Sequence, residues 1–451
     1  MEIKSDHLSG AKQILQRCLG LSKNQSLVIF VDETTISVGT VISEAADLLG
    51  ISQTTIFVPV SLQRKIPAES DLSLITQEIA REARAVLTCV NGSPECLPFR
   101  DKLLESLWSA RTRIGTMPGA TLDVLELANI DFDQLIADCH NIEFAMARGH
   151  TLEFISTTAD GKRHVLKVDI GGWERLPVAS DGIIEDGVWG NVPSGETYIA
   201  PIEGSGEGSV VINGSIPGLV IQPEQEIILY FEKGSLTRIE PQDNPTAQWL
   251  DQTQIQKAIE KKDLNWSNLA EIGIGTNPGV KQLTGNMLFD EKCAGTTHLA
   301  LGLNTFMGGT IKATIHCDMV VKSPSIIING KTILDHGRMH FVESEWHENY
   351  EQISLEGSPA RETANVLRSG TEVDFYGKRL QRILRPEPGR VSTCFVGDDD
   401  TSRLAYALYA NIPPDDKGIS IGSLARKSEI DDETTRRVLH IMQDYSLIRL
   451  Y

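Results

Sequence analysis

The first third of the chain alternates between two patterns of apolar side chains. Apolar residues recur at helical spacing in some segments and form continuous buried-type runs in others, which predicts helices over 10–21 and 38–50 and strands over 25–32 and 54–60. Repeated strand–helix–strand units of this kind predict a mostly parallel sheet covered by helices, so we expect residues 1–139 to form an α/β domain. No G-x-G-x-x-G motif follows the first strand, so no dinucleotide site is expected there.

From about residue 150 the pattern changes to short alternating strands separated by turn dipeptides. Two hairpins are predicted, over 152–170 with an Asp160-Gly161 turn and over 325–337 with an Asn329-Gly330 turn. One longer helix is predicted over 247–266. We therefore expect residues 140–343 to form a β-rich α+β domain.

The last part of the chain predicts a separate small module. Residues 344–400 are acidic and polar and contain a Pro-rich segment, which is typical of a connecting region. Residues 401–451 predict three helices and a terminal strand, the order of a winged-helix-like module. This module has 7 Lys or Arg and 7 Asp or Glu, so it lacks the basic face of a DNA-binding domain. It is expected to bind a peptide or protein partner, or else only to cap or dimerise the protein.

Composition narrows the possible partners and location. The 451 residues carry 42 basic and 61 acidic side chains, a net charge of −19, which argues against binding to nucleic acid or to an anionic membrane. The seven cysteines contain no C-x-x-C pair, which suits reduced thiols in a cytoplasm. No segment has the pattern of a secretory signal or a membrane span. These features predict a cytoplasmic protein.

The strand predicted around ATIHCDMVV carries the first candidate chemistry. Side chains alternate along a strand, so His316 and Asp318 share one face and Cys317 points to the other. An imidazole and a carboxylate on one face can reach the same cation. They could equally form a hydrogen bond with each other inside a core.

Three more residues could join this pair. Glu271 opens the apolar, glycine-interrupted segment EIGIG, where a carboxylate is costly to bury unless a positive group meets it. His298 follows a run of small residues, and Glu196 follows a Pro-Ser-Gly turn before a predicted strand. Five such ligands are about what two neighbouring hydrolytic metals need when waters fill the other positions. One metal with three ligands is the smaller alternative.

These segments resemble the metal-binding region of the aminopeptidase T and aminopeptidase S family of metallopeptidases. The resemblance rests on PSGE before a strand, EIGIGTNPG, DEKCAGTTHLALG and IHCD, in that order, and on GTMPGAT at 115–121. It covers roughly residues 10–345 and does not include the C-terminal module. It implies a homodimer in which two divalent ions, zinc, cobalt or manganese, are held by Glu196, Glu271, His298, His316 and Asp318.

The sequence departs from the family at one position. Where the aminopeptidases usually have a tyrosine that steadies the tetrahedral intermediate, this chain has Asn304, with Phe306 two residues further on. An amide can donate a hydrogen bond to an oxyanion, but it lacks the acidity and reach of a phenol. A related branch of the same fold resembles dihydroxypyridine ring-cleaving dioxygenases, which hold one ferrous ion and have a histidine near the position of Glu271.

The leading hypothesis is a metal-dependent hydrolase that cleaves an N-terminal residue or a small amide through a metal-activated water. Glu271 is the expected bridging carboxylate, and Glu203 and Glu291 are the candidate proton acceptors. Glu203 could instead lie at an exposed strand end, and Glu291 could simply pair with Lys292. The alternatives are a mononuclear iron dioxygenase, and a catalytically altered homologue that binds a peptide or protein as a scaffold in a biosynthetic pathway.

Overall fold

A computed structural model describes residues 4–65, 83–93, 95–107, 112–147, 149–171, 175 and 177–340 of the chain. The predicted connecting region and the predicted winged-helix-like module lie outside these residues. The chain divides into two compact units. The α/β unit comprises Met1–Ala137, Ser180–Glu196 and Asn277–Lys281, and the β-rich unit comprises Asp138–Ala179, Thr197–Thr276 and the residues from Gln282 onward.

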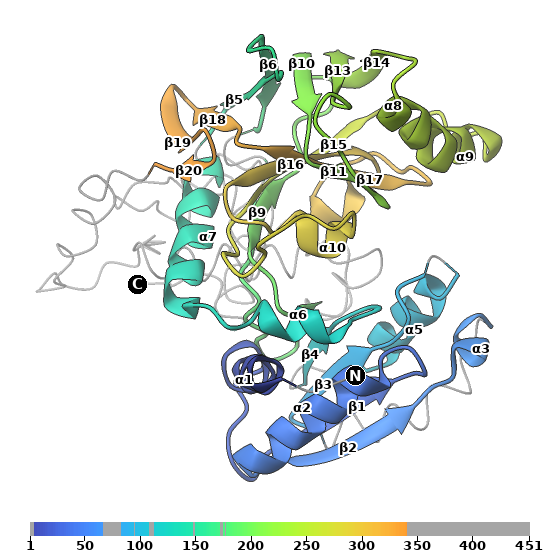
Figure 1. Cartoon of the computed structure of the whole chain (residues 1–451), viewed down its shortest axis with the longest axis vertical. Helices are drawn as coiled ribbons and strands as arrows, with labels where there is room; N and C mark the ends of the chain where they lie inside the picture. Colours follow the sequence, from blue (N-terminus) through green and yellow to red (C-terminus); the bar gives the residue numbers. More distant parts are fainter. Residues whose placement is uncertain are drawn as a thin grey trace, which may run out of the picture. The chain divides into compact units, whose positions relative to one another are not determined.

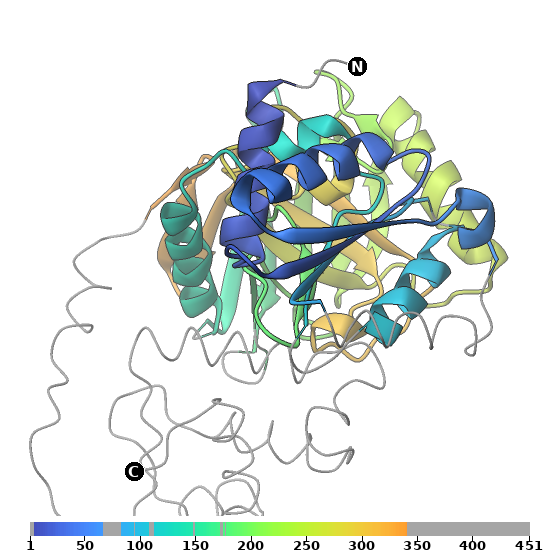
Figure 2. The same cartoon turned by 90° about the horizontal axis from the view of Figure 1, so that it is seen from below.

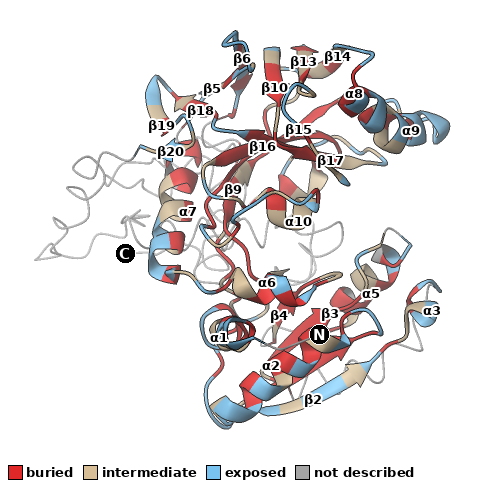
Figure 3. Ribbon diagram, viewed as in Figure 1, coloured by how far each residue is buried: buried red, intermediate tan, exposed pale blue. Residues whose placement is uncertain are grey.

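The α/β unit is built on a five-stranded parallel sheet in the order β2-β1-β3-β4-β8 (Figure 1). The strands are β1 (Ser26–Val31), β2 (Ser52–Phe57), β3 (Ala85–Cys89), β4 (Arg113–Thr116) and β8 (Trp189–Asn191). The predicted parallel sheet is thus confirmed. Strand β3 is buried throughout and β1 nearly so, whereas β2 is largely exposed at the edge of the sheet (Figure 3).

The last strand of this sheet comes from outside the range that the sequence pattern assigned to the α/β domain. Strand β8 pairs in parallel with β4, with Ile114 opposite Trp189. The unit therefore takes in residues well beyond 139. A three-residue strand carries too little periodicity to be recognised from sequence, and its partner lies more than seventy positions upstream.

Helices cover the parallel sheet because their regularly spaced apolar residues pack against it, as the sequence pattern predicts. Helix α5 packs Phe99, Leu103 and Leu107 against Val86 of β3 and Ile114 of β4 in one apolar cluster. Helix α2 lies along β1 and β2 (Figure 2). It ends where Gly50 takes a left-handed conformation with φ +69°. The helices of this part of the chain are α1 (Ser5–Gln13), its π-helical extension η1 (Ile14–Cys18), α2 (Ile36–Leu49), α3 (Val60–Gln63), α5 (Leu97–Leu107) and α6 (Leu122–Glu126).

The first sheet of the β-rich unit has eight antiparallel strands in the order β14-β13-β10-β6-β5-β18-β19-β20. Both predicted hairpins lie in it. In the second, Asn329 and Gly330 have φ of +48° and +79°, the two left-handed positions that a tight hairpin turn requires. The strands are β5 (Thr151–Thr157), β6 (Arg163–Asp169), β10 (Glu207–Ile212), β13 (Ile227–Glu232), β14 (Ser235–Glu240), β18 (Ser325–Ile328), β19 (Lys331–Asp335) and β20 (Arg338–Met339).

The second sheet has seven strands in the order β12-β11-β17-β16-β15-β9-β7. Its strands are β7 (Val178–Ser180), β9 (Glu196–Ile199), β11 (Ser215–Ile216), β12 (Leu219–Val220), β15 (Leu269–Gly275), β16 (Thr296–Gly302) and β17 (His316–Lys322). Residues of both sheets, such as Phe154 and Leu229 of the first and Ile272 and Leu299 of the second, share one buried apolar core. The two sheets are therefore held together by hydrophobic burial.

Short helices accompany these sheets along the chain. The helix predicted over 247–266 is observed as α8 (Pro245–Leu250), the π-helical segment η3 (Asp251–Ile255) and α9 (Gln256–Glu260). The others are α7 (Phe132–Ala147), α10 (Met287–Asp290) and the 3-10 turn η4 (Thr305–Met307). Across the part of the chain that the structure describes, every helix is too short or too polar to cross a lipid bilayer.

Candidate metal centre

The central three strands of the seven-stranded sheet bring four of the predicted ligands onto one face. Glu271 of β15 lies opposite Ala300 of β16, and Ala300 lies opposite Asp318 of β17. Directly opposed residues in an antiparallel sheet point to the same face, so the two carboxylates flank a small methyl group. His298 and His316 lie two residues from this row on their own strands and share its face.

The intervening residues of the same strands explain why the ligands face this way. Ile272, Leu299 and Met319 belong to the apolar core shared by the two sheets. Burial of these side chains fixes the register, because a slip of one residue would turn every side chain to the other face. The hydrophobic core therefore dictates that the polar residues between them project from the opposite face of the sheet.

The four side chains form a continuous chain of contacts around Glu271. Glu271 Oε1 lies 3.1 Å from Nε2 of His298, and Glu271 Oε2 lies 3.1 Å from Nε2 of His316. Nε2 of His316 is also 3.2 Å from Oδ1 of Asp318. The donor atoms of Glu271, His316 and Asp318 all lie within 4.8 Å of one another. His298 is fully buried, whereas the side chain of His316 is 20% exposed, so the cluster is accessible from the His316 end.

The hydrogen bond made by Nδ1 of His316 shows that Nε2 is the nitrogen able to bind a cation. Nδ1 of His316 lies 2.7 Å from the backbone oxygen of Leu303, which can only accept a hydrogen bond, so Nδ1 carries a proton. In the neutral ring the lone pair then lies on Nε2 and faces the carboxylate oxygens of Glu271 and Asp318. A lone pair directed at two carboxylates requires a positive charge, either a proton on Nε2 or a metal ion. This donor set therefore fits a divalent cation.

The electrostatics of the cluster agree with this reasoning. Burial favours the neutral form of Glu271 and would raise its pKa, but hydrogen bonds from His298 and His316 outweigh burial and lower the pKa to about 2. Burial alone would lower the pKa of His316, but the charge of Asp318 and the contacts with both carboxylates raise that pKa well above its usual value. Both shifts are in the direction that favours a positive charge between the two carboxylates.

Gly273 makes room for His298. The two residues are opposite each other on β15 and β16, and a Cβ atom at Gly273 would lie 2.1 Å from Nε2 of the imidazole. Since His298 is fully buried, its ring cannot swing into solvent. The glycines of the EIGIG segment therefore serve a packing purpose that the sequence motif alone does not explain.

We expect Gly273→Ala to destabilise the protein by about 1–3 kcal/mol, because the added methyl group overpacks a buried site. The free energy of unfolding from denaturant titration measures this loss. The same substitution in a His298→Ala background should cost much less, because the clashing ring is absent. An equal loss in both backgrounds would contradict this account of Gly273.

Glu196 occupies the first position of β9, and β9 neighbours β15 in the sheet. Glu196 is 5% exposed, and a carboxylate is costly to bury unless a polar or positive group meets it. Its participation as a fifth ligand stays a prediction from the sequence motif. The structure brings together the other four predicted ligands.

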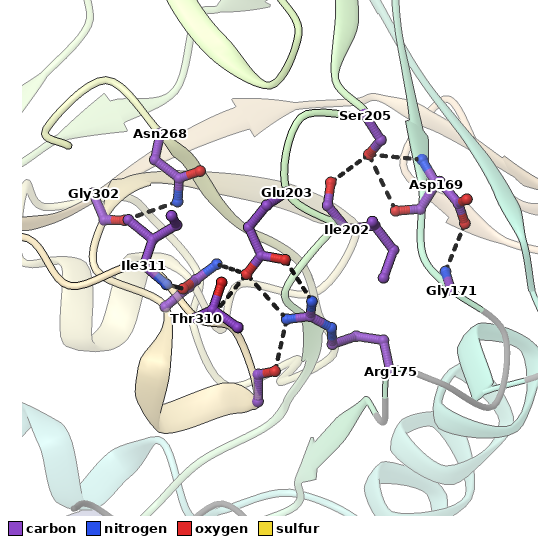
Figure 4. A network of polar contacts seen from close by, with 12 residues as sticks. Asp169, Gly171, Arg175, Ile202, Glu203, Ser205, Asn268, Gly302, Thr310 and Ile311 are labelled. Atoms are coloured by element: carbon purple, nitrogen blue, oxygen red, sulfur yellow. Dashed lines mark hydrogen bonds and ion pairs between the residues drawn. The ribbon is translucent and has the colours of Figure 1, made fainter. Parts of the chain in front are cut away.

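Two of the predicted catalytic residues form a separate polar network in the β-rich unit (Figure 4). Glu203 Oε2 accepts a hydrogen bond from Arg175 Nη2 at 2.7 Å, and Glu203 Oε1 accepts from Asn304 Nδ2 at 3.1 Å and from the backbone N–H of Thr310 at 2.7 Å. Burial raises the pKa of Glu203, but Arg175 and the N–H of Thr310 more than compensate and lower the pKa to about 2. Such a carboxylate is a weak proton acceptor at neutral pH.

Asn304 is fully buried, and both ends of its amide are engaged. Its Nδ2 donates to Glu203 and its Oδ1 accepts from the N–H of Ile311 at 2.8 Å. Because the residue is fully buried, its amide cannot reach a substrate in this conformation, so the geometry favours a structural role. Arg175, which completes the network, carries no recognisable signal in the sequence, because buried and exposed arginines look alike there.

Glu291, the other predicted proton acceptor, follows helix α10 and forms an ion pair with Lys292. This is the alternative that the sequence already suggested. The side chain of Lys292 is only 2% exposed, and a buried ammonium needs such a partner.

A second group of possible ligands, His7, Asp123 and Glu126, was not predicted from the sequence. Here Nδ1 of His7 accepts a hydrogen bond from the N–H of Lys4, so the neutral ring carries its proton on Nε2. That Nε2 lies 3.0 Å from Glu126 Oε1. Asp123 of this group is exposed and Glu126 is half-buried, and exposed acidic groups are common without a metal ion.

Comparison with known proteins identifies the fold of this chain but not its family. No protein-family model matches the chain, and no curated protein matches it. Among solved structures, the chain is similar to 2,5-dihydroxypyridine dioxygenase from Pseudomonas putida KT2440, with a TM-score of 0.55 and 18% identity over 75% of this chain and 98% of that one. It is also similar to AmpT from Thermus thermophilus, with a TM-score of 0.52 and 17% identity over 74% of this chain and 98% of that one. At these identities the likeness shows a shared fold.

Proposed function

We propose that the protein is a metal-dependent hydrolase of the aminopeptidase type. The observation that carries this proposal is the convergence of Glu271, His316 and Asp318, with Nε2 of His316 facing two carboxylates while Nδ1 donates to a backbone carbonyl. The shared fold with AmpT and the motifs that resemble the aminopeptidase T family support the same class of reaction.

Glu196, Glu271, His298, His316 and Asp318 would together hold two divalent ions, zinc, cobalt or manganese. The position of Glu271 supports a bridging role, because each of its carboxylate oxygens faces a different histidine. When bound, divalent cations in such a site lower the pKa of a water molecule and polarise the carbonyl of a substrate.

The residues of the chain itself prepare the site for this chemistry. Leu303 fixes the ring of His316 and keeps its Nε2 lone pair directed into the cluster. The buried pair of Glu271 and His298 keeps one side of the site dry, where charges interact more strongly than in water. Glu203 and Glu291 stay the proposed proton acceptors, and each is held in an ion pair, Glu203 with Arg175 and Glu291 with Lys292.

A peptide or a small amide is the substrate class that follows from this proposal. We also propose that residues 401–451 bind a peptide or protein partner and that the protein forms a homodimer.

The likeness to the dioxygenase, which has a TM-score of 0.55, favours a second candidate function, a mononuclear iron enzyme that cleaves aromatic rings. The group of Glu271, His316 and Asp318 offers three ligands, as such a site needs. It contains two carboxylates and one histidine, whereas non-haem iron oxygenases typically use two histidines and one carboxylate. The donor set therefore favours the hydrolase.

Metal content of protein purified without chelator, followed by hydrolysis of aminoacyl amides, tests the proposal. We expect about two equivalents of zinc, cobalt or manganese per chain and release of an N-terminal residue that stops when the metal is removed by chelation. About one equivalent of iron with ring cleavage would favour the dioxygenase. Metal without turnover would point to a binding scaffold, and protein that takes up no metal would rule out both enzymes.

A further inference from the structure

The loop between β16 and β17 carries the two groups that hold the ring of His316. The backbone oxygen of Leu303 accepts the hydrogen bond from His316 Nδ1 at 2.7 Å. The ring of Phe306 packs edge-on against the imidazole, with centroids 4.9 Å apart and planes at 69°. The orientation of this proposed metal ligand therefore depends on the conformation of the loop.

Asn304, which lies between these two residues, closes the loop on itself. Its side-chain Oδ1 accepts from the N–H of Ile311 at 2.8 Å, and its backbone N–H donates to the oxygen of Ile311 at 3.2 Å. Its backbone oxygen accepts from the N–H of Gly309 at 3.0 Å. A Cβ atom at Gly309 would lie 2.0 Å from Cγ of Asn304, so the packing is close enough to require glycine.

Glu203 and Arg175 hold the same loop from outside (Figure 4). Arg175 Nη1 donates to the backbone oxygen of Gly308 at 2.8 Å, and Glu203 Oε1 accepts from the N–H of Thr310 at 2.7 Å and from the amide of Asn304 at 3.1 Å. Arg175 is 6% exposed. Charge-assisted hydrogen bonds of this kind are among the stronger interactions in proteins, so they hold the loop in one conformation.

We propose that Arg175, Glu203 and Asn304 form a clamp that positions His316 for metal binding, with Asn304 acting through the loop. The inference rests on the proposed function in so far as the cluster binds a metal. The loop continues from Leu303, whose N–H donates to the oxygen of Ile315 at 2.8 Å, so its conformation is transmitted to the start of β17. Loosening the clamp frees the Leu303 oxygen and lets the imidazole turn away from Glu271 and Asp318.

Asn304→Asp tests the clamp with a minimal change of shape. The aspartate can still accept from the N–H of Ile311, but it loses the donor to Glu203 and places a second carboxylate beside it. We expect its affinity for Zn²⁺ to fall about 10- to 100-fold, the usual cost of removing an outer contact of a metal ligand. The absorption spectrum of the Co²⁺-loaded protein should change as well, which a loss of stability alone would not cause.

Asn244→Asp is the matched control. Asn244 is also buried in the β-rich unit, and its Oδ1 accepts from the N–H of Thr246 at 2.8 Å while its Nδ2 donates to the oxygen of Glu226 at 3.0 Å. The substitution removes the same kind of donor away from the loop, so Zn²⁺ affinity should be unchanged. Glu203→Gln is a second test of the clamp, expected to weaken Zn²⁺ binding in the same direction, in case Asn304→Asp does not fold. Unchanged affinity and unchanged Co²⁺ spectra in the folded clamp variants would overturn the proposal.

A metal-free measurement separates the clamp from the proposed function. In ¹⁵N-histidine spectra of the protein without metal, we expect the Nδ1 proton of His316, which the Leu303 oxygen holds, to exchange slowly with water in the wild type and in Asn244→Asp, and to exchange faster in Asn304→Asp. A wild type that binds no metal but shows this difference would refute the hydrolase and retain the clamp. An identical His316 signal in all three proteins would refute the clamp whether or not metal binds.

Discussion

Replacing His316 with alanine is expected to abolish tight metal binding, with Zn²⁺ affinity falling more than about 100-fold, beyond the cost of losing an outer contact. Nε2 of His316 lies 3.1 Å from Glu271 Oε2 and 3.2 Å from Asp318 Oδ1, so its removal takes away the nitrogen ligand that these two carboxylates share. Equilibrium dialysis with Zn²⁺ or Co²⁺, followed by elemental analysis, measures the loss. Any aminopeptidase activity should disappear with the metal.

His336→Ala provides the control for this substitution. His336 also forms a histidine–aspartate pair, with Nδ1 2.7 Å from Oδ1 of Asp335, but its side chain is 79% exposed on the turn after β19. Exposed pairs contribute little to binding or stability, so this variant should keep the metal content of the wild type. If His316→Ala retained full metal content, the cluster on β15, β16 and β17 would not be the metal site.

The sequence predicted the parts of the candidate site that depend on local periodicity. Alternation along one strand was enough to place His316 and Asp318 on a common face, and the structure has them there. Burial of Glu271 in an apolar segment indicates that a partner must meet it, and the Nε2 atoms of two histidines lie 3.1 Å from its oxygens. The hairpin turns could also be predicted from local sequence, because an Asn-Gly dipeptide favours the backbone conformation of a tight turn.

What the sequence could not predict depends on contacts between distant segments. The sequence makes Glu203 a candidate base because it does not reveal the partners of this carboxylate, Arg175 28 positions upstream and Asn304 101 positions downstream. A carboxylate and an amide have no intrinsic role, and only the residues that they meet in the fold decide whether they react or hold a loop. The same reason explains why the short strand β8 was not assigned to the parallel sheet.

The affinity of the site for metal should rise steeply with pH, whereas the contribution of His316 to the stability of the metal-free protein should fall as pH rises. In the metal-free protein, His316 has a raised pKa, so its charged ring stabilises the fold below the unfolded value of about 6.5 and this contribution is lost as pH rises through the folded pKa. Glu271 has a pKa lowered to about 2, so its contribution is present above about 4.3 and is lost as pH falls through the folded pKa.

A metal ion must displace the proton from Nε2 of His316, because both occupy the same lone pair. Below the folded pKa of His316, each pH unit should therefore raise metal affinity by up to about tenfold, equivalent to about 1.4 kcal/mol. In this experiment the Zn²⁺ concentration is fixed at about 100 times the dissociation constant measured near pH 8. The increase in melting temperature on adding Zn²⁺ should then be small near pH 5.5 and large near pH 8. His336→Ala should show the same slope, since the exposed pair takes no part. Zn²⁺ affinity that did not change with pH would mean that the metal binds without displacing this proton, and the positive charge between the two carboxylates would then belong to the imidazolium alone.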